Sequence, residues 1–378
     1  MEYNNYNTEV TEQEIENGVK DNQGCVYSQD GKRLLKAASD LKTYTIKEGT
    51  EIICNESFQG CSELQSVVFS DSVKAVGSDA FCCEKLESVK LSESLESLFN
   101  GAFLFCNSLK SIVFPKSLTK IGAEAFWGCE ALKIVVLPDT PIDIEQNVFK
   151  ECVSLKSIEL PKSIARIGGN AFPKEIKITS HSERYVVKND LFIDLKEQRL
   201  VQCLKNKESV KIPKNIVTID TGAFEECYLL EKIELPETLT TIGSDAFSVC
   251  AGLKSITLPE TVTSIGDGAF FLCSSLEDVT MFDSIEEIHK DTFRECSSLA
   301  RIYIPMGKKE LYGKNLKKRQ QRLIKEIDCR NSYDFYEKVE ETKKREIKKG
   351  KMINLFGVII LVIVCIYLLW NGIIQNKH

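Results

Sequence analysis

Apolar residues recur along the chain in a fixed order, with polar residues between them. The segment from Leu253 to Cys273 reads LKSITLPETVTSIGDGAFFLC, and its neighbours follow the same order, L-x-x-I-x-L-P-x-x-V/L-x-x-I-G-x-x-A-F-x-x-C. The phenylalanine of each copy marks the register, at Phe58, Phe81, Phe103, Phe126, Phe149, Phe172, Phe224, Phe247, Phe270 and Phe293. Its spacing within the first six and within the last four is 23 residues, with one step of 22. Ten copies at this period predict a repeat solenoid in which each copy forms one rung.

Each copy predicts two short strands and a helical turn. Ile256 and Leu258 alternate with Thr257, which is typical of a strand with one buried face, and a proline ends it. The segment V-T-S-I-G predicts a second strand, and glycines at positions 77, 122, 168, 243 and 266 indicate turns with unusual backbone angles. The segment D-x-A-F-x-x-C predicts one helical turn. Because a single rung cannot bury its own apolar face, we expect a right-handed, β-rich leucine-rich-repeat solenoid whose core forms by stacking.

The repeat is interrupted once, and this interruption defines the domains. Residues 185–204 read YVVKNDLFIDLKEQRLVQCL and resemble residues 25–41, CVYSQDGKRLLKAASDL. We interpret both as β-hairpins that start a repeat block, the first of them capping the solenoid. The sequence thus predicts a flexible acidic leader (1–24), a first block with its cap (25–172), a linker with the second hairpin (173–210), a second block (211–305), a basic helical neck (306–352), a membrane helix (353–374) and a short tail (375–378).

The apolar segment at residues 353–374, INLFGVIILVIVCIYLLWNGII, predicts a transmembrane helix. Its 22 residues carry no charge, and at 1.5 Å per residue they span about 33 Å, which matches a hydrocarbon core of about 30 Å. Tyr367 and Trp370 fit an interfacial belt. The flank KKREIKKGK (343–351) favours the cytoplasmic side, and residues 1–24 contain no apolar secretion signal. We therefore expect a single-pass membrane protein with cytosol-facing repeats, and a cell-surface location is the alternative.

Charge is distributed unevenly along the chain. Residues 1–306 hold 32 Lys or Arg against 47 Asp or Glu, whereas residues 307–351 hold 16 against 8. Nucleic-acid binding needs clustered basic residues to neutralise phosphates, so an acidic body argues against nucleic acid as a partner. The basic neck beside the apolar segment is suited to anionic lipid headgroups.

The column pattern, as in Leu230–Cys250 and Leu253–Cys273, resembles that of the BspA-like leucine-rich repeat family over roughly residues 44–305. This resemblance implies a leucine-rich-repeat solenoid. Known members are cell-surface or secreted proteins that adhere to host matrix or to neighbouring cells, so it also implies an adhesin as the alternative function. Fold alone does not determine function, so a membrane-anchored scaffold that presents a protein-binding surface remains the other interpretation.

Nine of the fifteen cysteines occupy one repeat column, at Cys61, Cys83, Cys106, Cys129, Cys152, Cys227, Cys250, Cys273 and Cys296. In leucine-rich repeats this position points inward, and we expect each thiol to donate to a backbone carbonyl of the turn. Disulfides between rungs would distort a regular ladder. No Cys-x-x-Cys occurs, and His181, His289 and His378 lie far apart, so we expect no metal or cofactor. Many buried free thiols favour a reducing compartment.

No catalytic constellation is evident. His181 lies in a polar linker, His289 lies in a turn, and the paired Glu286 and Glu287 fit a solvated surface. The chain lacks a phosphate-binding glycine loop. We therefore expect a binding protein and not an enzyme.

The exposed strand position between the Ile and Leu columns is the candidate partner surface. Its residues are Val68, Lys90, Val113, Val136, Glu159, Glu234, Thr257, Thr280 and Tyr303. Three valines on one exposed sheet would form an apolar patch, which is typical of an interaction site. The other interpretation is that valine simply favours strands. Our hypothesis is that the first block carries the partner surface.

Overall fold

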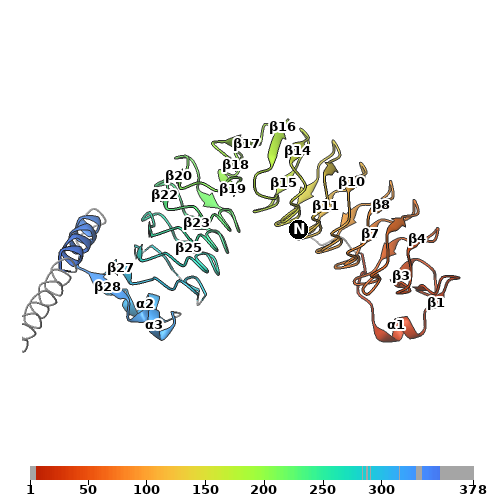
Figure 1. Ribbon diagram of the computed structural model, residues 1–378, viewed down its shortest axis with the longest axis horizontal. Coiled ribbons are helices and arrows are strands. Elements are labelled where there is room, and N and C mark those ends of the chain that lie inside the picture. The colour runs from red at the N-terminus through yellow and green to blue at the C-terminus, as the bar shows by residue number, and fades with distance from the viewer. Residues whose placement is uncertain are drawn as a thin grey trace, which may run out of the picture.

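The chain forms an arched solenoid whose rungs stack from one end to the other (Figure 1). This computed structural model describes residues 6–282, 284–286, 288–289, 291–314, 316–328 and 334–349. A typical rung contributes one strand to each of two faces, in agreement with the two strands expected per repeat. We call the strands of the nine-stranded and six-stranded sheets inner strands and those of the remaining sheets outer strands, because Figure 1 shows β7, β11 and β23 toward the inside of the arch and β8, β10 and β14 toward its outside.

The inner strands are short, and they form two sheets. Their bounds are β1 Val19–Lys20, β2 Val26–Tyr27, β3 Arg33–Lys36, β5 Ile52–Ile53, β7 Ala75–Val76, β9 Ser97–Leu98, β11 Lys120–Ile121, β13 Asp143–Ile144, β15 Arg166–Ile167, β17 Tyr185–Lys188, β18 Leu191–Asp194, β19 Arg199–Cys203, β21 Thr218–Ile219, β23 Thr241–Ile242 and β25 Ser264–Ile265. The first sheet runs from β1 to β15 and the second from β17 to β25. Each sheet opens with three antiparallel strands, β1-β2-β3 and β17-β18-β19, which include a hairpin at each of the two places where the sequence predicts one. The strands that follow are parallel, and each residue pairs with the residue at the equivalent position of the preceding rung.

The outer strands form several shorter sheets. Their bounds are β4 Thr43–Thr45, β6 Ser66–Val68, β8 Ser88–Lys90, β10 Ser111–Val113, β12 Ile134–Val136, β14 Ser157–Leu160, β16 Lys177–Ser180, β20 Ser209–Lys211, β22 Lys232–Glu234, β24 Ser255–Thr257, β26 Asp278–Thr280, β27 Arg301–Pro305 and β28 Ile324–Ile327. The sheets are β4-β6-β8, β10-β12, β14-β16, β20-β22 and β24-β26-β27-β28. An arch is longer on its outside, so rungs that stay hydrogen-bonded on the inner side separate at intervals on the outer side.

The segment around each core phenylalanine is a chain of turns, and the predicted helical turn is wrong. Asp245 and Val249, two residues before and after Phe247, have φ of 52° and 59°, in the left-handed region. The Phe247 amide donates to the carbonyl of Ala269 in the next rung at 2.8 Å. In a helix these backbone groups would bond within the same rung. Here they link neighbouring rungs, because stacking satisfies the backbone better than one isolated helical turn.

The repeat glycines are required by close contact, which corrects the reason expected from sequence. Gly77, Gly122, Gly168, Gly243 and Gly266 do not have positive φ. A Cβ on Gly243 would lie 2.5 Å from the Thr221 nitrogen, and one on Gly266 would lie 2.3 Å from the Ser244 nitrogen. Other rungs carry a side chain in this column, for example Phe99. Glycine is therefore required only at those rungs whose backbones approach each other closely.

The core is a column of stacked aromatic rings. Phe247 is fully buried between Phe224 and Phe270, with ring centroids 5.0 and 5.3 Å apart and interplanar angles of 9° and 1°. The same stacking joins Phe58 to Phe172 in the first block through consecutive repeat phenylalanines. Each ring covers the face that its neighbour would otherwise expose, which is why the rungs are stable only as a stack.

The second hairpin separates the core into two. Phe192 and Val201 belong to the apolar cluster of the first block, whereas Leu191, Ile193 and Leu200 belong to that of the second. Successive residues of a strand point to opposite faces, so β18 and β19 form a wall with an apolar surface on each side. All nine residues of these two strands are buried.

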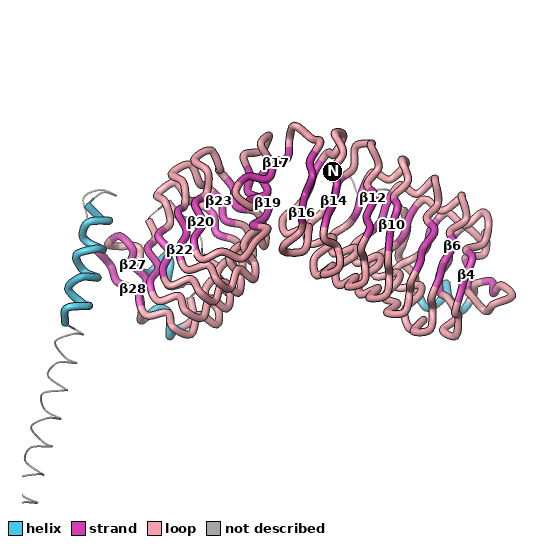
Figure 2. The backbone as a smooth tube through the Cα atoms, turned by 45° about the horizontal axis from the view of Figure 1, so that its top comes forward, coloured by secondary structure: helices cyan, strands magenta, loops and turns pink. Residues whose placement is uncertain are grey.

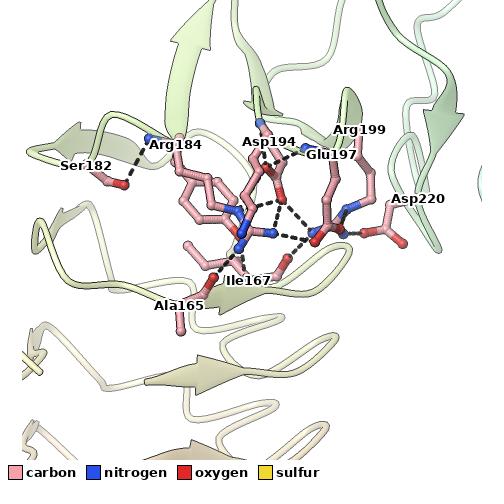
Figure 3. Close-up of polar contacts among 10 residues, drawn as sticks. Ala165, Ile167, Ser182, Arg184, Asp194, Glu197, Arg199 and Asp220 are labelled. Carbon is pink, nitrogen blue, oxygen red and sulfur yellow. Dashed lines mark hydrogen bonds and ion pairs between the residues drawn. The ribbon is translucent and has the colours of Figure 1, made fainter. Parts of the chain in front are cut away.

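Buried polar groups join this wall to the last inner strand of the first block (Figure 3). Arg199 donates to the Ile167 carbonyl at 2.8 Å, Arg184 donates to the Ala165 carbonyl, and the Tyr185 hydroxyl accepts from the Ile167 amide at 2.8 Å. Asp194, fully buried, accepts from Arg184 at 2.7 Å. Burial, the largest single influence, raises the pKa of Asp194, but the hydrogen bonds from Arg184 and the Glu197 amide and the charges of Arg184 and Arg199 together hold that pKa below its usual range. Side chains thus replace the strand that would continue the first sheet.

The N-terminal segment packs on the solenoid from residue 6 onward, so the expected flexible leader is corrected for residues 6–24. Helix α1 (Glu12–Glu16) begins with a capping box at Thr11. The carbonyl of the buried Thr8 accepts from the Asn55 amide at 2.9 Å, and the Tyr6 hydroxyl donates to Glu96 at 2.6 Å. Arg33 pairs with Glu14 at 2.6 Å. The acidic residues of this segment therefore serve as partners for the cap, which composition could not show.

The neck adds one more strand to the stack of rungs, which corrects the expected boundary at residue 305 and the all-helical neck. Helices α2 (Lys309–Gly313) and α3 (Lys318–Gln321) lead to β28, which pairs in parallel with β27. Residues 334–349 are helical. Within the described residues, no helix has both the length and the apolar composition needed to span a membrane. The predicted membrane segment, 353–374, lies outside them.

Candidate interaction surface

The outer strands follow one another along one face of the solenoid (Figure 2), and they carry the candidate partner residues. Seven of the nine are exposed there, namely Val68, Lys90, Val113, Val136, Glu159, Glu234 and Thr257. The register places Val113 beside Val136, whereas Val68 lies beside Lys90. The structure therefore brings two of the three valines together and separates the third from them by a lysine.

Ile134 is a further apolar residue of this surface that the sequence analysis missed. It lies on β12 and is 57% exposed, compared with 62% for Val113 and 45% for Val136. Serine occupies the equivalent position at Ser66, Ser88, Ser111, Ser157, Ser209 and Ser255. The sequence signal that could have revealed Ile134 is an isoleucine at a repeat position that is most often serine. We call Val113, Ile134 and Val136 the apolar strip.

The apolar strip borders a groove where the outer sheet is interrupted. One sheet ends at β12 and the next begins at β14, and a cavity of about 640 Å³ lies along this boundary. Ile134 and Val136 line one side, and Ser157 and Glu159 line the other. The side of the groove formed by β12 is therefore apolar, and the side formed by β14 is polar.

Charged residues of both signs surround the groove. Lys133 and Lys162 line it together with Asp139 and Glu159. His181 Nε2 lies 4.0 Å from a Glu159 carboxylate oxygen, and both side chains are solvent-exposed. A screened, exposed contact of this kind contributes little to stability. An apolar centre with a charged rim is typical of a protein-binding surface and can hold a partner in one orientation.

Thr280 and Tyr303 are buried, so the expectation that they are exposed is wrong. Tyr303 packs with Phe282 against Phe335 and Val339 of the helical segment 334–349. Lys343 of that helix lies 5.6 Å above the Tyr303 ring. This helix covers the last outer strands. The helix does not belong to the repeat, so the repeat columns of the sequence could not reveal it. These two positions are closed to a partner in this structure.

The cysteine column forms the hydrogen-bonded ladder expected from the sequence. Cys106 donates to the Phe81 carbonyl at 2.8 Å, Cys250 to that of Phe224 at 3.2 Å, and Cys296 to that of Phe270 at 3.0 Å. The thirteen cysteines that the structure describes are all free thiols. No cluster of three or more His, Cys, Asp or Glu suited to a metal ion occurs in that part of the chain.

Several solved structures have folds similar to this chain, and two of the three described next are named as leucine-rich proteins. A leucine-rich cell surface protein from Faecalibacterium prausnitzii is 24% identical with a TM-score of 0.55, and the match covers 82% of this chain and 98% of that one. The pneumococcal vaccine antigen PcpA is 21% identical with a TM-score of 0.55, over 82% of this chain and 96% of that one. A leucine-rich repeat protein from Eubacterium ventriosum is 23% identical with a TM-score of 0.50, over 69% and 72%.

None of the curated proteins matches this chain. The repeat pattern described as the BspA type leucine rich repeat region matches residues 31–153, 119–189 and 196–320, which together are most of the chain. The two faces, the phenylalanine stack and the cysteine ladder recur along these matched residues. The chain is therefore a member of the BspA-type leucine-rich repeat family.

Proposed function

We propose that this chain is a protein-binding solenoid displayed at the cell surface and held there by residues 353–374. The apolar strip beside its groove is the observation that carries the proposal. A partner that covers Val113, Ile134 and Val136 would remove three exposed branched side chains from water. Fully burying an exposed side chain of this kind contributes about 1.5–3 kcal/mol, and these three are already about half buried. Together with the charged rim, this contribution makes the strip the proposed centre of a larger contact between proteins.

The relatives support the surface location. One similar structure is called a cell surface protein and another a vaccine antigen. We propose no catalytic role, and the partner would be a protein of host matrix or of a neighbouring cell.

A cytosol-facing membrane scaffold is the second candidate, and two observations favour it. The flank 343–351 is strongly basic, which is typical of the cytoplasmic side of a membrane helix. The thirteen described cysteines are free, which is typical of a reducing compartment. Both candidates use the same apolar strip and differ in the side of the membrane on which it lies.

Protease accessibility distinguishes the two locations. Cells that express the full chain would be treated with protease intact, and again after permeabilisation as the control. Cleavage of the repeats on intact cells supports surface display. Protection until permeabilisation contradicts it and makes the cytosolic scaffold the leading function.

Substitutions on the outer face test the binding surface separately. Val113→Glu with Val136→Glu places two charges in the apolar strip, and we expect cells that display this variant to lose adhesion to immobilised matrix proteins. Val68→Glu is the matched control, because Val68 is also an exposed strand valine but lies apart from the strip. Circular dichroism would show that both variants fold. Equal adhesion by both variants would contradict the proposal that this strip binds the partner.

A further inference from the structure

Lys150 and Glu225 form an ion pair across the junction of the two blocks. Lys150 follows the core residue Phe149, and Glu225 follows the core residue Phe224, so both occupy the same repeat position. The rung between them has Pro173 at this position. Lys150 Nζ lies 2.8 Å from Glu225 Oε2, in a contact between residues 75 positions apart in the sequence. The lysine and the glutamate therefore meet past a proline that carries no functional group.

Asn170 brings a carboxamide to the same carboxylate. Its Nδ2 donates to Glu225 Oε2 at 2.7 Å, and this is the oxygen that also accepts from Lys150. The lysine amine and the asparagine amide therefore lie within two hydrogen-bond lengths of each other. Asn170 is buried, and a Cβ on Gly222 would lie 3.2 Å from its Nδ2, so the amide is packed closely in place.

Gln202 of the hairpin wall fixes the other end of this amide. Gln202 Nε2 donates to Asn170 Oδ1 at 3.1 Å. Gln202 is fully buried and is held by the Phe172 backbone, whose amide donates to Gln202 Oε1 at 3.2 Å and whose carbonyl accepts from Gln202 Nε2 at 2.7 Å. The amide oxygen of Asn170 thus faces a fixed N–H donor, which would stabilise negative charge on that oxygen.

The Lys150–Glu225 pair is enclosed, unlike the surface ion pairs between other rungs. Its side chains are 13% and 18% exposed, compared with 62% and 48% for Lys254 and Glu231. The Trp127 ring covers the amine, with its centroid 5.0 Å from Lys150 Nζ. Proton transfer within an ion pair removes both charges, so desolvation favours it. The transfer leaves a neutral amine, which is the nucleophilic form of lysine.

We propose that Lys150, Asn170 and Glu225 form a self-crosslinking site, in which the Lys150 amine displaces the amide nitrogen of Asn170 and leaves an isopeptide bond between the two side chains. The contacts of both nitrogens with one carboxylate oxygen carry this assignment. They place a nucleophile, an electrophile and a proton carrier together in one site, which is what an intramolecular acyl transfer requires.

The reaction balances without an oxidant or a cofactor. Glu225 takes a proton from the Lys150 ammonium, and the neutral amine attacks Asn170 Cγ. A new C–N bond forms, and the electron pair of the amide C=O bond moves to Oδ1, where Gln202 donates to it. Glu225 returns its proton to Nδ2 and accepts one from the attacking nitrogen. The C–Nδ2 bond breaks as the C=O bond reforms, and ammonia leaves. It takes the remaining proton from Glu225 as ammonium.

The product ties the last two rungs of the first block together covalently. Lys150 belongs to the rung of Phe149, and Asn170 belongs to the rung of Phe172, against which the hairpin wall packs. The crosslink closes residues 150–170 into a loop, which restricts the unfolded chain and keeps this rung attached. Glu225 is regenerated, so it acts as a catalytic residue in this reaction.

The test uses the full chain, purified in detergent and measured by mass spectrometry before and after trypsin digestion. We expect an intact mass lower than that of the printed sequence by one ammonia. Trypsin does not cleave after an acylated lysine, so the peptides that contain Lys150 and Asn170 should stay joined, and fragmentation should locate the bond between these two side chains. Cleavage after Lys150 in the full population would overturn the proposal. Loss of ammonia with linear peptides, as a cyclised asparagine would give, would overturn it equally.

Two variants test the roles of the residues, and a third is the matched control. Glu225→Gln keeps the size of the side chain but cannot carry the proton, and Lys150→Arg keeps the charge but not the nucleophilic amine, so we expect neither to form the crosslink. Asn147→Ala should leave it unchanged, because Asn147 occupies the repeat position of Asn170, with φ of 58° against 52°, in the preceding rung. Circular dichroism would show that the variants fold. A crosslink that forms at the same rate in Glu225→Gln would refute the catalytic role of Glu225.

Discussion

Gly243→Ala is the sharpest test of why the repeat contains glycine. An alanine Cβ at this position would lie 2.5 Å from the Thr221 nitrogen and 2.7 Å from the Asp220 carbonyl carbon. Both of these are backbone atoms of the preceding rung and cannot rotate away. Ordinary contact begins near 3.4 Å, so the two rungs must separate locally by about 0.9 Å.

The cost of this separation can be worked from the structure. The Gly243 amide donates to the Ile219 carbonyl at 2.8 Å, and an added 0.9 Å would break that bond. A lost hydrogen bond contributes about 0.5–1.5 kcal/mol, and overpacking contributes about 1–3 kcal/mol. We therefore expect Gly243→Ala to destabilise its rung by about 2–4 kcal/mol.

Hydrogen exchange of the peptides that span residues 219–247 measures this effect at the rung itself. A loss of about 2–4 kcal/mol corresponds to exchange faster by about 30- to 1,000-fold, where exchange reports the opening equilibrium. Gly60 provides the comparison, since it has φ of 85° and open space around it. Asn tolerates left-handed angles better than Ala, so Asn should be milder than Ala at Gly60 and no milder at Gly243. If Asn were the milder substitution at Gly243, backbone conformation and not close contact would explain that glycine.

Two further predictions concern the core and the junction. Phe247→Ala leaves a cavity between two stacked rings and should destabilise the second block by about 3–5 kcal/mol in urea unfolding, whereas Leu229→Ala, on an exposed residue, should change it by less than about 0.5 kcal/mol. The folded pKa of Asp194 is below its unfolded value of about 3.9, so the stability that it contributes is complete above about pH 5 and is lost as the pH falls through the folded pKa. Hydrogen exchange of residues 184–203 between pH 3 and 6 should show this loss, and Asp194→Asn should weaken the junction at pH 7 and remove its acid dependence; an unchanged pH profile would contradict this.

The sequence predicted what repeats and missed what depends on the distance between repeats. Period, strand pairing, the phenylalanine stack and the cysteine ladder all follow from columns of one residue type, because equivalent residues must lie above one another. The helical turn was wrong because the turn backbone bonds to the next rung, as Phe247 does to Ala269. The reason for Gly243 was wrong because a close approach between rungs leaves no mark in a single sequence.

The candidate surface was predicted in part for a similar reason. The column rule found Val113 and Val136, which lie side by side, but could not locate the interruption of the outer sheet next to them. Ile134 required a comparison down a serine column. Tyr303 was misplaced because its cover, the helix at 334–349, belongs to no repeat.

The junction at the second hairpin also has a mechanical consequence. If the first block is bound to a partner while the other end of the solenoid is fixed, a pulling force passes through β15 and the hairpin wall. Elsewhere along this path, many backbone hydrogen bonds join neighbouring rungs. At the junction only a few backbone bonds remain, and the other hydrogen bonds come from side chains, among them Arg184, Arg199 and Gln202. Under tension, the two blocks should part at this seam first while each remains folded, so that the protein lengthens before any rung is lost.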